Sequence, residues 1–143
     1  MYITGNRIID CALIAWFLAQ LIKVLLELLM ERRFRPSLLV SSGGMPSSHS
    51  ACVMGCTTAV GKSTGWGSPL FAVCIVFSVV VMYDACNVRR SAGDTAKRVN
   101  QLMKRVERLT AEDIAEDLKI IMGHTPLQVL MGALLGVAVG FLL

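Results

Sequence analysis

The chain has 143 residues, of which 55% are hydrophobic and 17% are charged, and its mean hydropathy is +0.63. This composition is too apolar for a soluble domain of this size and predicts an integral membrane protein. The formal net charge is +4, but the basic residues flank the apolar stretches. They therefore indicate membrane topology, and we expect no nucleic-acid partner.

Four apolar stretches each approach the roughly 17–25 residues that a bilayer-spanning helix needs. They cover residues 8–30, roughly 45–61, 69–86 and 126–143. The second is marginal, because its start is polar and Thr57 and Thr58 interrupt its end, so a tilted or buried helix is an alternative there. We expect an all-α membrane bundle of about four transmembrane helices, forming a single domain over residues 1–143.

The first stretch carries Gln20, Lys23 and Glu27 on one helix face, well inside the apolar run. Charge at such a depth is costly and usually faces a partner or a polar cavity. An ion pair between Lys23 and Glu27 is one interpretation. We prefer a second, in which Lys23 reaches an anion held by the segment that follows.

The second stretch opens with GGMPSSHS, residues 43–50, the most informative segment of the chain. Gly43 and Gly44 allow the backbone to approach an anion closely, and Pro46 suits a first helical position. The next N–H groups would then point outward at the positive end of the helix dipole. His49 follows one turn in, placed to exchange a proton. The pattern predicts a phosphate cradle, although a capped helix start would explain this segment taken alone.

Asp84 lies near the end of the third stretch and is followed by Asn87, Arg89 and Arg90. These residues supply a carboxylate and two guanidinium groups at the membrane boundary. We expect at least one arginine to bind an anion, with Asp84 as a possible support. The other arginine could be only an interfacial anchor.

The segment 91–121 is not a span, because its apolar residues recur at helical spacing against Lys and Arg. This pattern predicts an amphipathic helical insertion at the membrane interface, and residues 110–113 resemble the cap of a second short helix. With four crossings, this basic segment and the basic loop 31–36 lie on one side, which positive-inside bias assigns to the cytoplasm. We therefore expect a cytoplasmic site, in a bacterial plasma membrane or an organelle membrane.

The fourth stretch follows His124 and continues through Gln128, Gly132, Gly136 and Gly140, each four residues on. On a helix, His124 and Gln128 can touch, and the glycines can pack closely on another helix. In so small a bundle the stripe leads us to expect a homodimer. Taken separately, His124 could be an interfacial histidine and Gln128 an interhelical hydrogen-bonding residue.

The polar groups together are those of metal-free phosphoryl transfer: two histidines, a Gly- and Ser-rich helix start, at least one arginine and a buried lysine. One imidazole would attack phosphorus, cations and N–H groups would bind the equatorial oxygens, and the other imidazole would protonate the leaving oxygen. We expect no cofactor. The five cysteines lie in apolar stretches without a zinc-binding pattern, so we expect no metal.

Several segments resemble the motifs of known proteins. Residues 46–50 (PSSHS) resemble the PSGH motif of the type 2 phosphatidic acid phosphatase superfamily, which includes vanadium-dependent haloperoxidases. Residues 124–132 resemble its last motif, His-x-x-x-Asp-Val-x-x-Gly. A closer resemblance, to the small membrane family described as divergent acid phosphatase and haloperoxidase-related, is carried by residues 42–51, 82–93 and 123–136.

The resemblance implies that His124 is the phosphorylated nucleophile and His49 the general acid. It also implies a phosphate-binding set, which comprises Lys23, Arg35, Ser47, Ser48 with the backbone around Gly44, and Arg89 or Arg90. Gln128 stands where the superfamily has an Asp that orients and charges the nucleophile, which predicts a weaker nucleophile. The arginine motif also lies much farther before His124 than is usual in the superfamily.

We therefore expect a membrane lipid phosphatase that hydrolyses a phosphate monoester or diphosphate. The expected substrate is of the phosphatidic acid, phosphatidylglycerol phosphate or polyprenyl diphosphate type. Gln128 favours an alternative, a non-catalytic lipid-phosphate binding or transport protein. A third interpretation is a metal-dependent hydrolase that uses Asp84 with Asp94 or Asp113. We do not expect haloperoxidase chemistry, since nothing indicates a secreted soluble enzyme.

Overall fold

The computed structural model describes residues 3–31, 44–110 and 123–143, and these residues form helices and connecting turns without a strand. The elements are α1 (Arg7–Glu31), α2 (Ser48–Thr64), α3 (Pro69–Tyr83), the π-helical turn η2 (Asp84–Val88), α4 (Arg89–Thr110) and α5 (Pro126–Leu142). The predicted all-α class is therefore confirmed for the described part of the chain.

The start of α2 differs from its expected position. Ser47 is the N-cap residue, and its hydroxyl accepts the N–H of Ser50 at 3.4 Å, so the helix begins at Ser48. Pro46 precedes the cap, and its predicted place at the first helical position is wrong. A serine side chain can satisfy an otherwise unpaired N–H of the first turn, which a proline cannot do. His49 consequently lies within the first turn.

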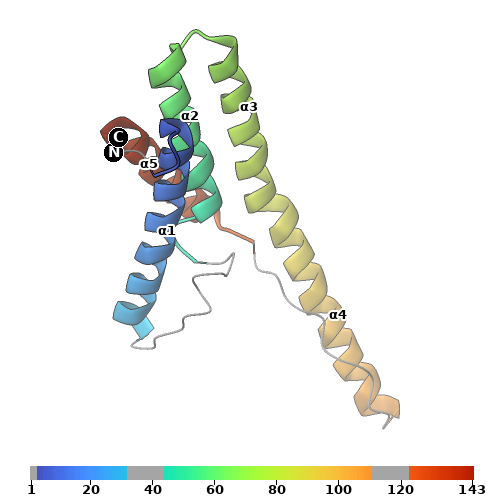
Figure 1. The fold of residues 1–143 in the computed structure, drawn as a ribbon. Coiled ribbons are helices and arrows are strands. Elements are labelled where there is room, and N and C mark those ends of the chain that lie inside the picture. The colour runs from blue at the N-terminus through green and yellow to red at the C-terminus, as the bar shows by residue number, and fades with distance from the viewer. Residues whose placement is uncertain (1–2, 32–43, 111–122) are drawn as a thin grey trace.

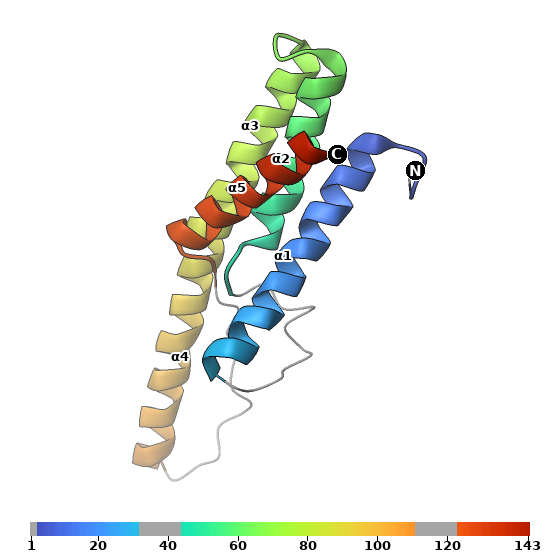
Figure 2. The same ribbon diagram turned by 90° about the vertical axis from the view of Figure 1, so that its left-hand side faces the viewer.

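Helix α2 is the central element, and α1, α3 and α5 all pack against it (Figures 1 and 2). Apart from Val60, its buried residues are small or polar, with Ala51 and Ala59 among them. On α1, the fully buried Cys11, Ala15 and Ala19 recur every four residues along one side. Small residues on both helices let the backbones approach closely, as is typical of helix contacts in membranes.

The glycine stripe of α5 packs against α2 of the same chain. A Cβ atom at Gly132 would collide with the carbonyl oxygen of Ser47, and one at Gly136 would collide with that of Ala51. A Cβ atom at Gly140 would lie 2.5 Å from the Cβ of Thr58. The helix contact predicted from the stripe is thus present, but it is intramolecular. The homodimer stays a prediction, and the stripe no longer supports it.

Helix α3 exposes apolar side chains over most of its surface; Val73, Val76, Phe77 and Val80 are each at least 60% exposed. Its contact with α2 includes a buried hydrogen bond of 2.8 Å between the hydroxyl groups of Thr57 and Ser78. Outward apolar residues with polar groups paired inside are the arrangement expected in a lipid bilayer, where water is absent.

Two segments, Arg7–Leu29 and Pro69–Arg105, are long and apolar enough to cross a membrane. Helix α5 is apolar but has 17 residues, and α2 has the same length with a more polar sequence. At 1.5 Å per residue such helices extend about 26 Å, slightly less than the roughly 30 Å of a bilayer's hydrocarbon core. Two of the four expected spans are therefore found as candidates.

Helices α3 and α4 run in line through η2, and α4 extends away from the rest of the bundle (Figure 1). The 37 residues of Pro69–Arg105 would extend about 55 Å, well beyond the hydrocarbon core. The basic part of this helix must therefore project from a membrane that α3 crosses. The predicted position of α4 along the membrane surface is not confirmed, and the predicted second short helix lies outside the described residues.

Candidate active site

The starts of α2 and α5 meet beside η2, at one end of the bundle. The backbone N–H of Ser47 donates to the carbonyl of Gln128 at 2.9 Å, and the N–H of His124 donates to the carbonyl of Ala85 at 2.9 Å. These two bonds join the three segments that the sequence analysis singled out. Each bond crosses between segments far apart in the sequence, so the site depends on the assembled fold.

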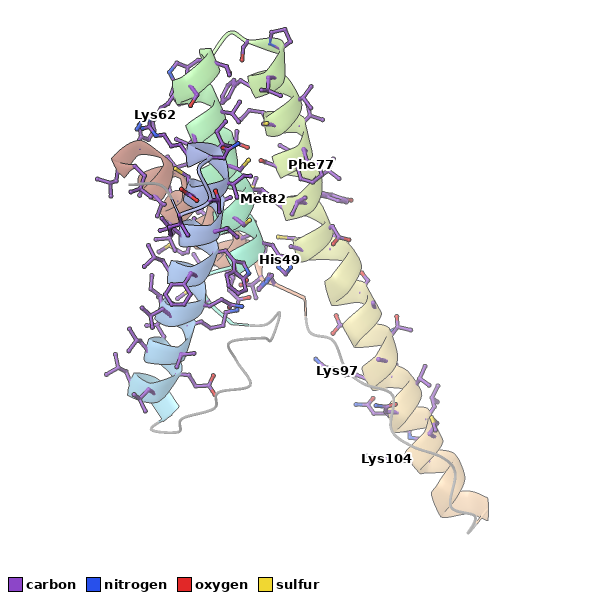
Figure 3. The ribbon with its side chains drawn as sticks, in the orientation of Figure 1. His49, Lys62, Phe77, Met82, Lys97 and Lys104 are labelled. Carbon is purple, nitrogen blue, oxygen red and sulfur yellow. The ribbon has the colours of Figure 1, made fainter. Side chains whose placement is uncertain are left out.

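The two histidines lie together at this junction. Their ring centroids are 6.1 Å apart with an interplanar angle of 62°. His124 is almost fully buried and His49 is half-buried. His49 lies on the side of α2 that faces α3, whereas Lys62 lies at the opposite end of the bundle (Figure 3). The proximity of the two rings gives the site two groups that can exchange protons or act as nucleophiles.

Gln128 fixes which nitrogen of a neutral His124 ring carries the proton. The backbone N–H of Thr125 lies 3.0 Å from one side-chain atom of Gln128, and because an N–H only donates, that atom is the oxygen Oε1. The same Oε1 lies 3.3 Å from Nδ1 of His124. An acceptor at this position favours the tautomer with its proton on Nδ1, which leaves the lone pair on Nε2.

Gln128 also has a second, structural contact that the sequence analysis missed. Thr125 is the N-cap of α5, and its hydroxyl accepts the N–H of Gln128 at 3.3 Å. This hydrogen bond and the one from the Thr125 N–H to the Gln128 side chain together form a capping box. The spacing Thr-x-x-Gln before an apolar run was the available sequence signal.

Lys23 is buried under residues 44–47, which form the cradle loop before α2. Its Nζ donates to Oε1 of Gln20 at 2.7 Å, and both residues are less than 5% exposed. Gly44 has φ +89°, and a Cβ there would lie 2.9 Å from Cγ of Lys23. Glycine is therefore favoured at residue 44 both for its backbone conformation and for the close approach of the lysine stem.

The serines of the cradle are buried and largely engaged with one another. Ser47 accepts a hydrogen bond from the hydroxyl of Ser50 at 3.1 Å, in addition to its capping role and its backbone bond to α5. Ser47 thus ties the two helix starts together. Ser48, the first residue of α2, is also buried. A phosphate-binding role for either serine stays a prediction.

The remaining predicted residues are only partly described. Arg35 lies outside the described residues, and Arg89 and Arg90 begin α4 directly after η2 but their side chains lie outside the described part. Asp84 is half-buried at the start of η2, next to the residue whose carbonyl binds the backbone of His124.

The described residues contain no cluster of three His, Cys, Asp or Glu side chains that could hold a metal ion. Asp94, one of the carboxylates suggested for a metal-dependent reaction, is well exposed, and its Oδ1 lies 3.7 Å from Nζ of Lys97. Asp113 lies outside the described residues. The described geometry therefore offers no support for a metal site built on Asp84 and Asp94.

The family model described as "Divergent PAP2 family" matches residues 4–139 of the chain. The chain belongs to this family. The match includes both histidines, the cradle loop and η2, so the divergent PAP2 assignment covers the whole candidate site and confirms the resemblance found in the sequence.

A relative in Bacillus subtilis (strain 168), the "Uncharacterized membrane protein YuiD", is 39% identical over 136 residues, which span 88% of this chain and 86% of the relative. No solved structure matches the chain. This divergent PAP2 chain thus has two helices long and apolar enough to cross a membrane, and the relative to which it is similar is described as a membrane protein.

Proposed function

We propose that this protein is a metal-independent lipid phosphatase that works through a phosphohistidine intermediate. The observation that supports it most is the pair of histidine rings, 6.1 Å apart, between two helix N-termini. In this proposal α2 and α5 complete a four-helix membrane bundle, and the histidines lie at its cytoplasmic face, near lipid headgroups. The substrates are phosphatidic acid, phosphatidylglycerol phosphate or a polyprenyl diphosphate.

In the proposed reaction, Nε2 of His124 attacks the phosphorus of the lipid phosphate. An N–P bond forms while the bond from phosphorus to the leaving oxygen breaks, and His49 donates a proton to that oxygen. Water then attacks phosphohistidine, with His49 taking its proton, and inorganic phosphate leaves. Buried imidazoles are suited to this role because their positions are fixed by the surrounding fold.

The proposed electrostatic stabilisation comes from cations and from helix starts. One proposed cation is the ammonium group of Lys23, which lies beside the cradle loop and donates a hydrogen bond to Gln20. The further proposed cations are Arg35, Arg89 and Arg90. A fixed positive group strengthens its interaction with phosphate oxygens when water is excluded. The N-terminus of α2 adds a favourable dipole.

A second candidate function is a non-catalytic lipid-phosphate binding or transport protein. The specific observation that favours it is the double use of Gln128, whose side chain completes a helix cap. The helix cap alone therefore explains why a glutamine stands at residue 128, even in a protein that catalyses no reaction. Moreover, a neutral amide stabilises a developing imidazolium less than a carboxylate does.

The decisive experiment measures phosphate release from purified protein with EDTA present, on a panel of the proposed lipids. We expect chelator-resistant turnover in the wild type and a loss of at least about 1,000-fold in His124→Ala, since the nucleophile would be gone. Lys62→Ala is the matched control, because Lys62 lies at the opposite end of the bundle and donates to the carbonyl of Phe141.

Three outcomes separate the candidates. Turnover lost in His124→Ala but kept in the control supports the phosphatase. Full turnover in a folded His124→Ala protein contradicts the assignment of the nucleophile. No turnover on any lipid, with binding of lipid phosphate retained, favours the binding or transport protein.

A further inference from the structure

An apolar groove of about 340 Å³ runs between α1 and α5, beside the cradle loop. Ile22 and Leu26 of α1 form one wall, and Met45 and Pro46 of the loop line the groove as well. Pro46 is buried and directly precedes Ser47, the N-cap of α2. The groove and the candidate phosphate site therefore share one short loop.

The other wall of the groove is formed by α5, with Met131 and Leu134 among its lining residues. These two side chains are 42% and 55% exposed, so the groove is open to the outside of the bundle. In the proposed four-helix membrane bundle, the outside of α5 is lipid. The lining residues are all apolar, and two of them are methionines, whose flexible side chains adapt to irregular shapes.

We infer that this groove holds one hydrocarbon chain of the lipid whose phosphate is bound at the histidine pair. The inference rests on the proposed function and deepens it. The cradle loop has two chemically different sides: Gly44 packs on the stem of buried Lys23, and Met45 and Pro46 face the groove. A molecule with an anionic phosphate joined to an apolar chain matches both sides of one loop.

The outer surface of α3 is the natural comparison. Ala72, Val73, Val76 and Phe77 line an apolar depression there of about 480 Å³, and Phe77 projects away from the bundle (Figure 3). No charged or polar residue lines it. Membrane lipid can contact this surface without selection by headgroup, whereas the groove beside the cradle loop is expected to select lipids that carry phosphate.

The test uses tryptophan fluorescence and lipids brominated on their acyl chains, which quench a nearby tryptophan. In a His124→Ala background, in which the proposed nucleophile is absent and the lipid stays intact, Trp16 and Trp66 are replaced by phenylalanine, and Leu134→Trp places one reporter at the groove. Val76→Trp, in the same background, is the matched control on α3. Each protein is reconstituted in phosphatidylcholine vesicles that contain equal mole fractions of brominated phosphatidic acid or brominated phosphatidylcholine.

We expect brominated phosphatidic acid to quench the groove reporter at least twofold more than brominated phosphatidylcholine, and both lipids to quench the α3 reporter equally. Equal quenching of the groove reporter by the two lipids would mean that bulk lipid alone fills the groove, which overturns the inference. Equal enrichment of phosphatidic acid at both reporters would overturn it too, because the selection would then not belong to the groove.

This readout does not depend on turnover, so the two proposals can fail separately. Headgroup-selective quenching, together with a wild-type protein that releases no phosphate, would keep the chain site and reject the reaction. In an active protein, Met131→Trp should raise KM at least fivefold for long-chain phosphatidic acid and much less for dihexanoyl phosphatidic acid, whose chains are too short to fill the groove. Val73→Trp should change neither. Equal losses on both substrates in Met131→Trp would contradict a chain-specific role.

Discussion

At the scale of single residues, the side chain of Gln128 connects the proposed chemistry with the start of α5. Its oxygen accepts from Thr125 and contacts Nδ1 of His124. An amide oxygen can fix the tautomer of a neutral ring, but it adds no negative charge to stabilise the imidazolium form. The residue that departs from the superfamily motif therefore keeps the orienting part of the expected role and lacks the electrostatic part.

Replacing Gln128 by glutamate tests this separation of roles. Glutamate keeps the length and the acceptor oxygen and adds charge, so we expect phosphate release to rise by about tenfold, as charge-assisted hydrogen bonds are roughly twice as strong as neutral ones. Gln128→Leu removes the acceptor, and we expect a fall of about 100-fold. Rates of phosphate release, with thermal unfolding as the check on folding, measure both. Unchanged rates in both variants would exclude an orienting role.

Gly44 offers a prediction about stability. Gly44→Ala combines an unfavourable backbone conformation at φ +89° with a contact on the stem of Lys23. Gly65 has nearly the same φ, +91°, and open space around it, so Gly65→Ala measures the cost of a positive φ without a side-chain contact, about 1–3 kcal/mol. We expect Gly44→Ala to lower the unfolding temperature further than Gly65→Ala. Equal shifts would show that Lys23 moves aside without cost.

At the scale of elements, the contact between α2 and α5 holds the site at one end and the bundle at the other. Gly132 lies against Ser47 at the cradle, whereas Gly140 lies against Thr58, eight residues farther along α5. The same close packing thus lies at the candidate active site at one position and away from it at the other.

We expect Gly132→Ala and Gly140→Ala each to destabilise the protein by about 1–3 kcal/mol through overpacking. Gly132→Ala should also reduce phosphate release strongly, because Ser47 must move and its bond to the carbonyl of Gln128 is disturbed. Comparing specific activity with denaturation midpoint for the two variants measures this difference. If both variants lose activity only in proportion to their loss of stability, the glycines of α5 position the helices but not the histidines.

The sequence predicted features that depend on local chemistry. Local signals mark the helix ends: an apolar run has a definite length, and a Thr-Pro or Ser-rich segment marks a helix start. The bounds of α1 and α5 therefore lie within one residue of their expected ranges. The proximity of His49 and His124 was anticipated from topology. The sequence did not predict the backbone bonds from Ser47 to Gln128 and from His124 to Ala85, because backbone groups leave no residue-type signature.

At the scale of the whole molecule, the long helix through α3 and α4 allows a test of which side of the membrane the proposed site faces. In a cysteine-free background, Gln101→Cys on α4 should react with a membrane-impermeant maleimide only after cells are lysed, if the site end is cytoplasmic. Ser63→Cys, at the other end of the bundle, should react in intact cells. The reverse pattern would place the proposed site on the outer face and contradict the assignment from basic residues.

The widened turn of η2 has a mechanical consequence. Its residue Ala85 accepts the backbone N–H of His124, so the orientation of α4, which extends away from the bundle (Figure 1), and the anchorage of a buried imidazole share one hydrogen bond. A displacement of α4 about this turn must carry residue 124 with it or break that bond. While that bond holds, helix α4 and the buried ring cannot be repositioned independently of each other.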